Sequence, residues 1–101
     1  MVAAMSRLTG PVAAIAEISR MGDENLGAWL REYDGYRGIL VLVDDDGQSA
    51  RLITLWDTPA DEERARASRG AMRDRLAAAA GMEVVEFGVY EVAGYDFPTP
   101  T

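Results

Sequence analysis

The feature that most constrains this chain is a hairpin with apolar side chains on both faces. It lies in GYRGILVLVDDDGQSARLITLWDT, residues 35–58, where Asp46-Gly47 is a strong turn signal between two strand-like runs. This turn predicts a register in which Asp44 faces Ser49. One face then carries Val43, Val41, Ile39, Arg37, Ala50, Leu52, Thr54 and Trp56, and the other carries Leu42, Leu40, Gly38, Tyr36, Arg51, Ile53, Leu55 and Asp57. A sheet built on this hairpin needs a cover on both sides.

The segments before the hairpin predict a strand and a helix. Residues 2–9 form the strand, which Gly10-Pro11 ends. Apolar residues then recur at helical spacing to about Glu32, although residues 21–25 either kink or split the helix. The recurring positions are Val12, Ile15, Ile18, Gly22, Leu26, Trp29, Leu30 and Tyr33. Gly35 is well placed for a left-handed cap at the end of this helix.

The segments after the hairpin predict a second helix and a last strand. Thr58 is a natural N-cap, Pro59 suits the first helical position, and Asp61 lies near the acid position of a capping box. Gly81 ends the helix, and residues 83–92 form the strand. The apolar stripe of the helix comprises Ala65, Met72, Leu76 and Ala79 or Ala80, with the polar Ser68 on the same line.

These elements follow the order β-α-β-β-α-β, which is a ferredoxin-like α+β unit. We expect one domain over residues 1–93, with an extended C-terminal arm over residues 94–101. Two helices cover one face of the four-stranded antiparallel sheet, which leaves Leu40 and Leu42 on the other face in water. A second copy related by a two-fold axis is the simplest cover, so we expect a homodimer through the sheet face.

Composition removes several kinds of chemistry. The chain has no Cys, no His and no Lys, and all ten basic residues are Arg. Thiol nucleophiles, imidazole bases, Schiff-base lysines and the usual zinc, iron–sulfur and haem ligands are therefore missing. We expect no cofactor and no metal, and the VDDDG segment is interpreted as a hairpin turn because it lacks the ligand spacing of a calcium loop.

Net charge and hydropathy argue against two classes of partner, nucleic acids and membranes. The net charge of −7 argues against nucleic acid, and the arginines between positions 64 and 75 lie among acids, as on a solvated helix face. No run has the length of a signal peptide or a membrane span. We therefore expect a cytoplasmic protein without a membrane partner.

Three runs carry a resemblance to a known family. GYRGILVLVD, LITLWDTPADEERA and VYEV resemble the dimeric α+β barrel superfamily, specifically the antibiotic-biosynthesis-monooxygenase-like domains and their small uncharacterised bacterial relatives. The resemblance covers most of residues 2–93. It implies a small-molecule cavity in each protomer, between the sheet and its helices. The family includes cofactor-free oxygenases of polyphenolic substrates, polyketide cyclases, haem-degrading enzymes and proteins without known activity. Where many relatives carry a His in the second helix, this chain reads ERARASRG, which weakens haem degradation.

The resemblance and the register together suggest binding residues on one face of the hairpin. Trp56 matches the aromatic residue that lines the cavity in relatives, and either stacks an aromatic ligand or closes the core. Thr54, Leu52, Ile39 and Arg37 are its expected neighbours. Arg37 either holds an enolate or phenolate oxygen or forms a salt bridge at the end of the strand.

Other polar candidates lie elsewhere on the sheet. Glu86 falls between positions that favour burial, and a buried carboxyl would have a raised pKa suited to proton transfer. The alternative is an ion pair with Arg7, Arg51 or another arginine across the sheet or dimer. Tyr33, Tyr36 and Tyr90 are the remaining hydroxyl donors near the sheet, and Tyr36 with Asp57 is assigned to the dimer rim.

Together these observations predict a homodimer that binds an aromatic or polyketide-like small molecule. Whether it is an enzyme stays open. An enzyme would be a cofactor-independent monooxygenase or cyclase, which stabilises the substrate anion with Arg37 and a tyrosine hydroxyl. One alternative is a non-catalytic binding or regulatory module in which Trp56 and Arg37 are satisfied by protein neighbours. Another is a haem-binding variant.

Overall fold

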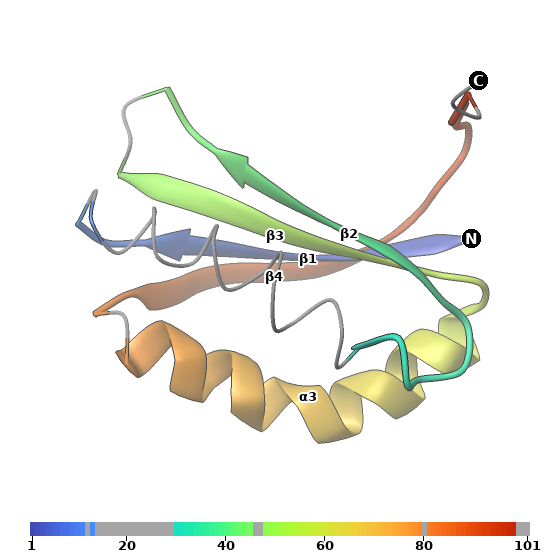
Figure 1. The fold of residues 1–101 in the computed structure, drawn as a ribbon, viewed down its shortest axis with the longest axis horizontal. Helices are drawn as coiled ribbons and strands as arrows, with labels where there is room; N and C mark the ends of the chain where they lie inside the picture. The colour runs from blue at the N-terminus through green and yellow to red at the C-terminus, as the bar shows by residue number, and fades with distance from the viewer. Residues whose placement is uncertain (12, 14–29, 46–47, 80, 99–101) are drawn as a thin grey trace.

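A four-stranded antiparallel sheet with a long helix against one face forms the frame of the protein (Figure 1). The structure, a computed structural model, describes residues 1–11, 13, 30–45, 48–79 and 81–98. Its elements are β1 (Val2–Thr9), β2 (Tyr36–Val43), β3 (Ser49–Trp56), α3 (Pro59–Ala79) and β4 (Glu83–Glu91). The strand order β2-β3-β1-β4 fits the predicted ferredoxin-like arrangement.

The predicted strands and the second helix are confirmed. The first strand spans Val2–Thr9 as predicted, and the last ends at Glu91, one residue earlier than expected. The predicted first helix and its interruption at 21–25 lie almost wholly outside the described residues, although Leu30 at its end is helical. Ser68 is exposed, so it does not continue the packed stripe of α3. Within the described residues, no helix is long and apolar enough to cross a membrane.

The start of α3 and the start of β2 are held together by Gly35. The Thr58 hydroxyl accepts a hydrogen bond from the Asp61 backbone N–H (3.1 Å) and donates to the Asp61 carboxylate (2.9 Å), as the predicted cap requires. Gly35 has φ of 80° and its carbonyl accepts from the Asp57 N–H at 2.8 Å. A Cβ at Gly35 would overlap the Asp61 carboxylate, so this position needs glycine for both its φ and its space.

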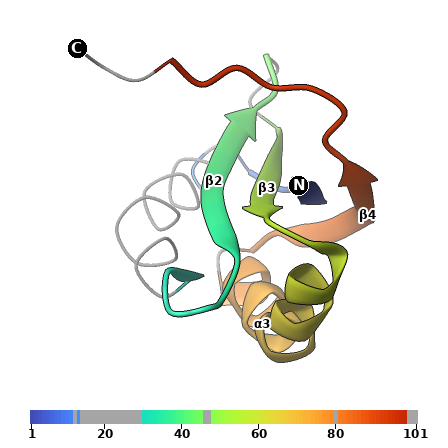
Figure 2. The ribbon, with the colours of Figure 1, turned by 90° about the vertical axis from the view of Figure 1, so that its right-hand side faces the viewer.

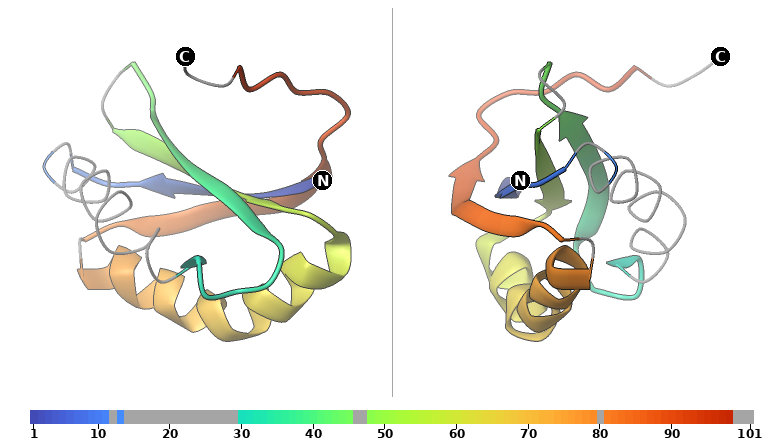
Figure 3. Two further views of the ribbon diagram at one scale, coloured as in Figure 1. Left: turned by 45° about the vertical axis from the view of Figure 1, so that its right-hand side comes forward. Right: turned by 90° about the vertical axis from the view of Figure 1, so that its left-hand side faces the viewer.

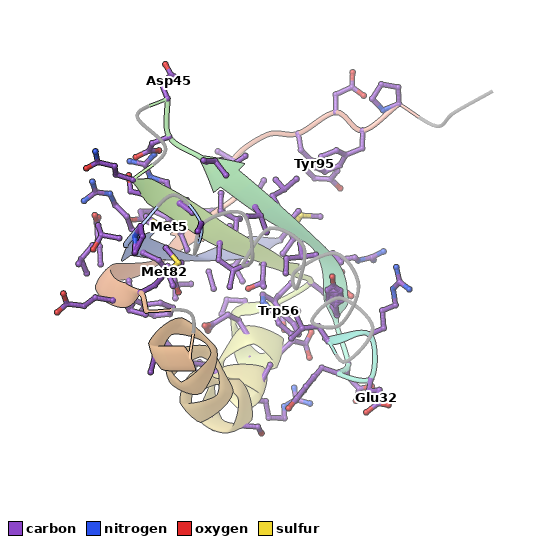
Figure 4. All side chains as sticks on the ribbon, turned by 60° about the vertical axis from the view of Figure 1, so that its left-hand side comes forward. Met5, Glu32, Asp45, Trp56, Met82 and Tyr95 are labelled. Atoms are coloured by element: carbon purple, nitrogen blue, oxygen red, sulfur yellow. The ribbon has the colours of Figure 1, made fainter. Side chains whose placement is uncertain are left out.

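Two clusters of buried residues lie on the inner face of the sheet, which we define as the face that α3 covers. The residues alternate along β1, where Val2, Ala4, Ser6 and Leu8 are buried. One cluster contains Val2, Leu30, Trp56 and Ala65, with Tyr33, Tyr36 and Ile39 packed against it. The other contains Leu8, Ala50 and Met82, with Val41, Leu52 and Val84. Trp56 therefore lies between the sheet and α3 (Figure 4).

The opposite face, called the open face below, carries exposed apolar side chains. Leu40, Leu42 and Tyr90 are exposed by 46%, 45% and 49%. After β4 the chain continues on the open-face side, away from α3 (Figures 2 and 3). Tyr95 and Phe97 of this arm stack on each other with centroids 5.3 Å apart. The apolar second face that the hairpin pattern predicts is therefore present.

Candidate functional site

An aromatic cluster on the inner face forms the candidate site. The rings of Tyr33 and Tyr36 meet the indole of Trp56 edge-on, with centroids 6.3 and 5.7 Å away and interplanar angles of 84° and 64°. Edge-to-face contacts of this kind are favourable beyond the area they bury. Trp56 itself has no exposed surface, whereas both tyrosines are only partly buried. Among these three rings, only those of the tyrosines thus belong to residues with exposed surface.

Thr54 fixes the indole of Trp56. Its side chain lies on the same face of β3, two residues earlier, and its hydroxyl accepts a hydrogen bond from the indole Nε1 at 3.0 Å. Only 1% of Thr54 is exposed. This bond satisfies the polar atom of the tryptophan inside the core. Thr54 and Trp56 therefore lie together as predicted, with the indole held by the protein itself.

Arg37 does not share the face of Trp56, and the predicted register is wrong at this point. Pairing follows the prediction from Val43 opposite Ala50 to Gly38 opposite Leu55. A β-bulge then adds Arg37 as an extra residue, so that Tyr36 stands opposite Trp56. Tyr36 is consequently a member of the inner cluster and does not face Asp57.

Arg37 forms the predicted alternative, a salt bridge at the end of the strand. Its Nε donates to the Asp57 carboxylate, and both side chains are well exposed. This hydrogen bond and the negative charge of Asp57 raise the pKa of Arg37. Gly38, a lone glycine inside a strand, is the sequence signal that indicates such a bulge.

The surroundings of Tyr36 disfavour its phenolate form. Burial raises the pKa of Tyr36 above its usual value, and the positive charge of Arg31 offsets only part of this effect. A neutral phenol is a hydrogen-bond donor at physiological pH. Tyr36 therefore carries a hydrogen-bond donor on a ring that meets the indole of Trp56.

Glu86 and Tyr90 lie on the open face, away from the aromatic cluster. A bulge in β4 pairs Leu8 with Val84 but Arg7 with Glu86, which moves Glu86 to the face opposite to that of Val84. Glu86 is exposed in the single chain, so it is not a buried carboxylate there. The predicted alternative is an ion pair with Arg7, Arg51 or another arginine across the sheet or dimer. No pair of Glu86 with an arginine of its own chain is among the ion pairs of the described residues, and a pair across a dimer stays a prediction.

Tyr90 lies flat along β4 over Gly88. A Cβ built at Gly88 would come within 2.7 Å of the Tyr90 hydroxyl oxygen. The small residue thus makes room for the ring on the open face. Tyr90 is separated from Trp56 by the sheet.

Glu62 is a buried carboxylate that the sequence reasoning missed. Only 1% of it is exposed, and its Oε1 lies 3.4 Å from the Nε of Arg66, one turn later in α3. The Arg66 guanidinium also covers the ring of Phe87, 5.3 Å from its centroid. The available signal is spacing, because Glu62 precedes Ala65 of the packed stripe by three residues. Acids are common in the first turn of a helix, so the sequence alone does not distinguish this buried carboxylate from an exposed one.

The acidic hairpin end is occupied by protein contacts. Asp44 accepts a hydrogen bond from the Ser49 hydroxyl and one from Arg51 Nη1 at 2.9 Å. The Asp44 N–H also donates to the Ser49 carbonyl at 2.9 Å, which confirms that these residues face each other. Within the described ranges, no group of three or more acidic side chains is placed to hold a metal ion.

These features define an α+β protein with an aromatic cluster between an antiparallel sheet and its helical layer. No protein-family model matches the sequence, and no curated protein matches it. Among solved structures, SnoaB from Streptomyces nogalater, a cofactor-independent oxygenase, is 22% identical, with 97% of each chain covered and a TM-score of 0.66.

Two further structures extend the comparison. The monooxygenase ActVA-Orf6 from Streptomyces coelicolor, in complex with Nanaomycin D, is 15% identical, with 97% of this chain and 91% of that chain covered and a TM-score of 0.71. NE2512 from Nitrosomonas europaea, a protein of unknown function, is 13% identical, with 98% and 95% covered and a TM-score of 0.72. The chain therefore has the fold of antibiotic-biosynthesis-monooxygenase-like proteins, which confirms the resemblance seen in its sequence.

Proposed function

We propose that this protein is a homodimer that binds an ionisable aromatic or polyketide-like small molecule between its sheet and its helical layer. The observation that carries the proposal is the cluster of Tyr33, Tyr36 and Trp56 on the inner face. Two proteins of the same fold support it, because one is a cofactor-independent oxygenase and the other is a monooxygenase in complex with the ligand Nanaomycin D.

Within this site the residues have different tasks. Trp56 and Thr54 form a fixed support, since both are buried and bonded to each other. Tyr33, Tyr36 and Ile39 are partly buried around that support, and they are the side chains we expect to contact the ligand. We assign the contact with a ligand oxygen, which the sequence suggested for Arg37, to Tyr36, because Arg37 is bound to Asp57.

The chemistry we infer is stabilisation of a ligand anion. The neutral Tyr36 hydroxyl donates a hydrogen bond to a phenolate or enolate oxygen, which lowers the pKa of the ligand. Cofactor-independent oxygenation by O2 and cyclisation both start from such an anion, so the ligand determines which follows.

A second function is favoured by the packing of Trp56. The indole has no exposed surface and its Nε1 is bonded to Thr54, as in a closed core. Arg37 is likewise satisfied by Asp57. These contacts are the ones expected of a non-catalytic binding or regulatory module with a packed interior.

One experiment separates the two functions. The protein is titrated with a panel of anthrones, flavonoids and other polyphenols, together with haemin, while thermal stability and ligand absorbance are followed. The proposed site raises the melting temperature and shifts a phenol ligand toward its phenolate spectrum. Tyr36→Phe abolishes the spectral shift, whereas Tyr95→Phe on the exposed arm preserves it. Oxygen consumption is then measured on the responding compound.

The outcomes are distinct. A spectral shift that survives in Tyr36→Phe contradicts the assigned role of Tyr36. No response to any phenol supports the non-catalytic module. A Soret change with haemin alone supports the haem-binding variant.

The homodimer is supported by the open face. Leu40 and Leu42 are nearly half exposed on neighbouring positions of one strand face, and a second copy is the simplest group that covers both. Sedimentation of the protein at micromolar concentration tests this part of the proposal. A monomer at that concentration contradicts it.

A further inference from the structure

Arg7 occupies an unusual position on the open face. It lies in β1 between two charged residues, directly opposite Arg51 of β3 on one side and Glu86 of β4 on the other. Its Nε is buried, and within the described part of the chain it has no hydrogen-bond partner. A buried donor on a cation is destabilising when it is left unsatisfied. The unsatisfied Nε of Arg7 therefore lowers the stability of the isolated chain.

Neither neighbour satisfies Arg7. Arg51 has the same charge, and like charges directly opposite on antiparallel strands repel each other. Asp44 neutralises Arg51 with a contact of 2.9 Å. Glu86 has the right charge, but it is exposed and takes no part in the ion pairs of the described residues. The open face thus presents a cation and an anion side by side, and neither belongs to an ion pair of the residues that the structure describes.

The rest of the open face indicates what completes this pair of charges. Leu40, Leu42 and Tyr90 expose about half of their surface there, so the partner that covers them also removes water from Arg7. In a two-fold interface, residue i of one copy contacts residue j of the other, and j contacts i. A face with one unpaired cation and one unpaired anion is therefore complementary to itself.

We propose that Arg7 of one copy forms an ion pair with Glu86 of a second copy, and that each dimer contains this pair twice. The inference rests on the proposed homodimer and identifies the contact that selects a second copy over other apolar partners. It also gives the Arg7 guanidinium a charged partner, which it does not have among the described residues of its own chain.

The test is a charge exchange between two copies. Arg7→Glu and Glu86→Arg are each expected to weaken self-association about 30-fold or more, because like charges then meet twice in the interface. When the two variants are mixed, every contact between copies again joins opposite charges. We expect the mixture to form heterodimers with an affinity close to that of the wild type, measured by native mass spectrometry and sedimentation. Arg64→Glu and Glu63→Arg, on the exposed surface of α3, are the matched controls and leave association unchanged.

Each other outcome overturns the inference in a recognisable way. A wild-type monomer overturns both the homodimer and the pair. A dimer that neither variant weakens, or one that both weaken without recovery on mixing, overturns the pair alone. If inorganic phosphate stabilises the wild type but not Arg7→Glu, while Glu86→Arg still dimerises, Arg7 binds a small oxyanion instead. If Arg7→Glu does not fold, Arg7→Gln replaces it, and preferential pairing with Glu86→Arg is still expected.

Discussion

Tyr36 lies directly opposite Trp56, with its ring centroid 5.7 Å from that of the indole, because a bulge at Arg37 shifts the register just before the two residues pair. Without the bulge, a charged guanidinium would stand beside the buried indole. The bulge replaces it with an aromatic ring and leaves Arg37 at the surface, where Asp57 binds it. One extra residue in β2 thus decides that this end of the core is aromatic and neutral.

The first prediction concerns Trp56 as the centre of that core. Trp56→Ala should lower the free energy of unfolding by about 3–5 kcal/mol, because it removes a large side chain with no exposed surface and leaves a cavity. Urea unfolding followed by far-UV circular dichroism measures the loss. Trp56→Phe should lose clearly less, since it keeps a ring against Tyr33 and Tyr36. Equal losses for Ala and Phe would contradict the aromatic packing.

The second prediction isolates the hydrogen bond between Thr54 and Trp56. Thr54→Val keeps the shape of the side chain but removes the acceptor of the indole Nε1, so we expect a loss of about 1–3 kcal/mol. Thr54→Ser retains the hydroxyl and is the matched control. The same unfolding measurement checks both variants. A stable Thr54→Val protein would show that the indole has another acceptor.

The third prediction follows from the raised pKa of Tyr36. Burial disfavours the phenolate in the folded state, so the folded pKa lies above the unfolded value of about 10. The contribution of neutral Tyr36 to stability is fully present below about pH 10 and is lost as the pH rises through the folded pKa. The melting temperature of the wild type should therefore fall more steeply above about pH 10 than that of Tyr36→Phe. Parallel curves for the two proteins would contradict the assignment, and Tyr95→Phe on the exposed arm is the control.

Much of this fold is predictable from the sequence because local chemistry and long-range packing agree. Thr58 and Asp61 cap α3 as their spacing predicts, and the Asp44–Ser49 pairing fixes the hairpin from its turn. The register fails at Arg37 and in β4 before Glu86, where single bulges reverse the faces of the residues beyond them.

The candidate site is less predictable for the same reason. A bulge changes the face of a side chain but leaves the hydrophobic pattern of the sequence almost unchanged. The predicted register therefore pairs Arg37 with Trp56, whereas the structure pairs Tyr36 with Trp56. The burial of Glu62 is not predicted, because a buried acid and a capping acid cannot be distinguished by sequence in the first turn of a helix. We expect the side chains of the open face to contact a second molecule, so the sequence of one chain predicts which charged and apolar groups lie there but not what they bind.

The fourth prediction tests the link between β2 and α3 at Gly35. Gly35→Ala should destabilise the protein by about 1–3 kcal/mol, because alanine is strained at a φ of 80° and its Cβ would displace the Asp61 carboxylate from the cap of α3. Gly94→Ala is the matched control, since a Cβ there meets no atom within 4 Å. Thermal unfolding compares the two. If Gly35→Ala is as stable as the wild type, the helix cap does not depend on the conformation of the turn at Gly35.

The last prediction concerns the open face. Leu40→Glu should convert the proposed homodimer to a folded monomer, because it places a charge within the apolar surface that we expect a second copy to cover. Val43→Glu is the matched control. Val43 is equally exposed, at 47% against 46% for Leu40, but its position opposite Ala50 puts it on the inner face of the sheet. Sedimentation velocity measures association and circular dichroism measures folding. If Val43→Glu dissociates the dimer and Leu40→Glu does not, the two copies meet through the other face, and the account of the two-faced hairpin fails.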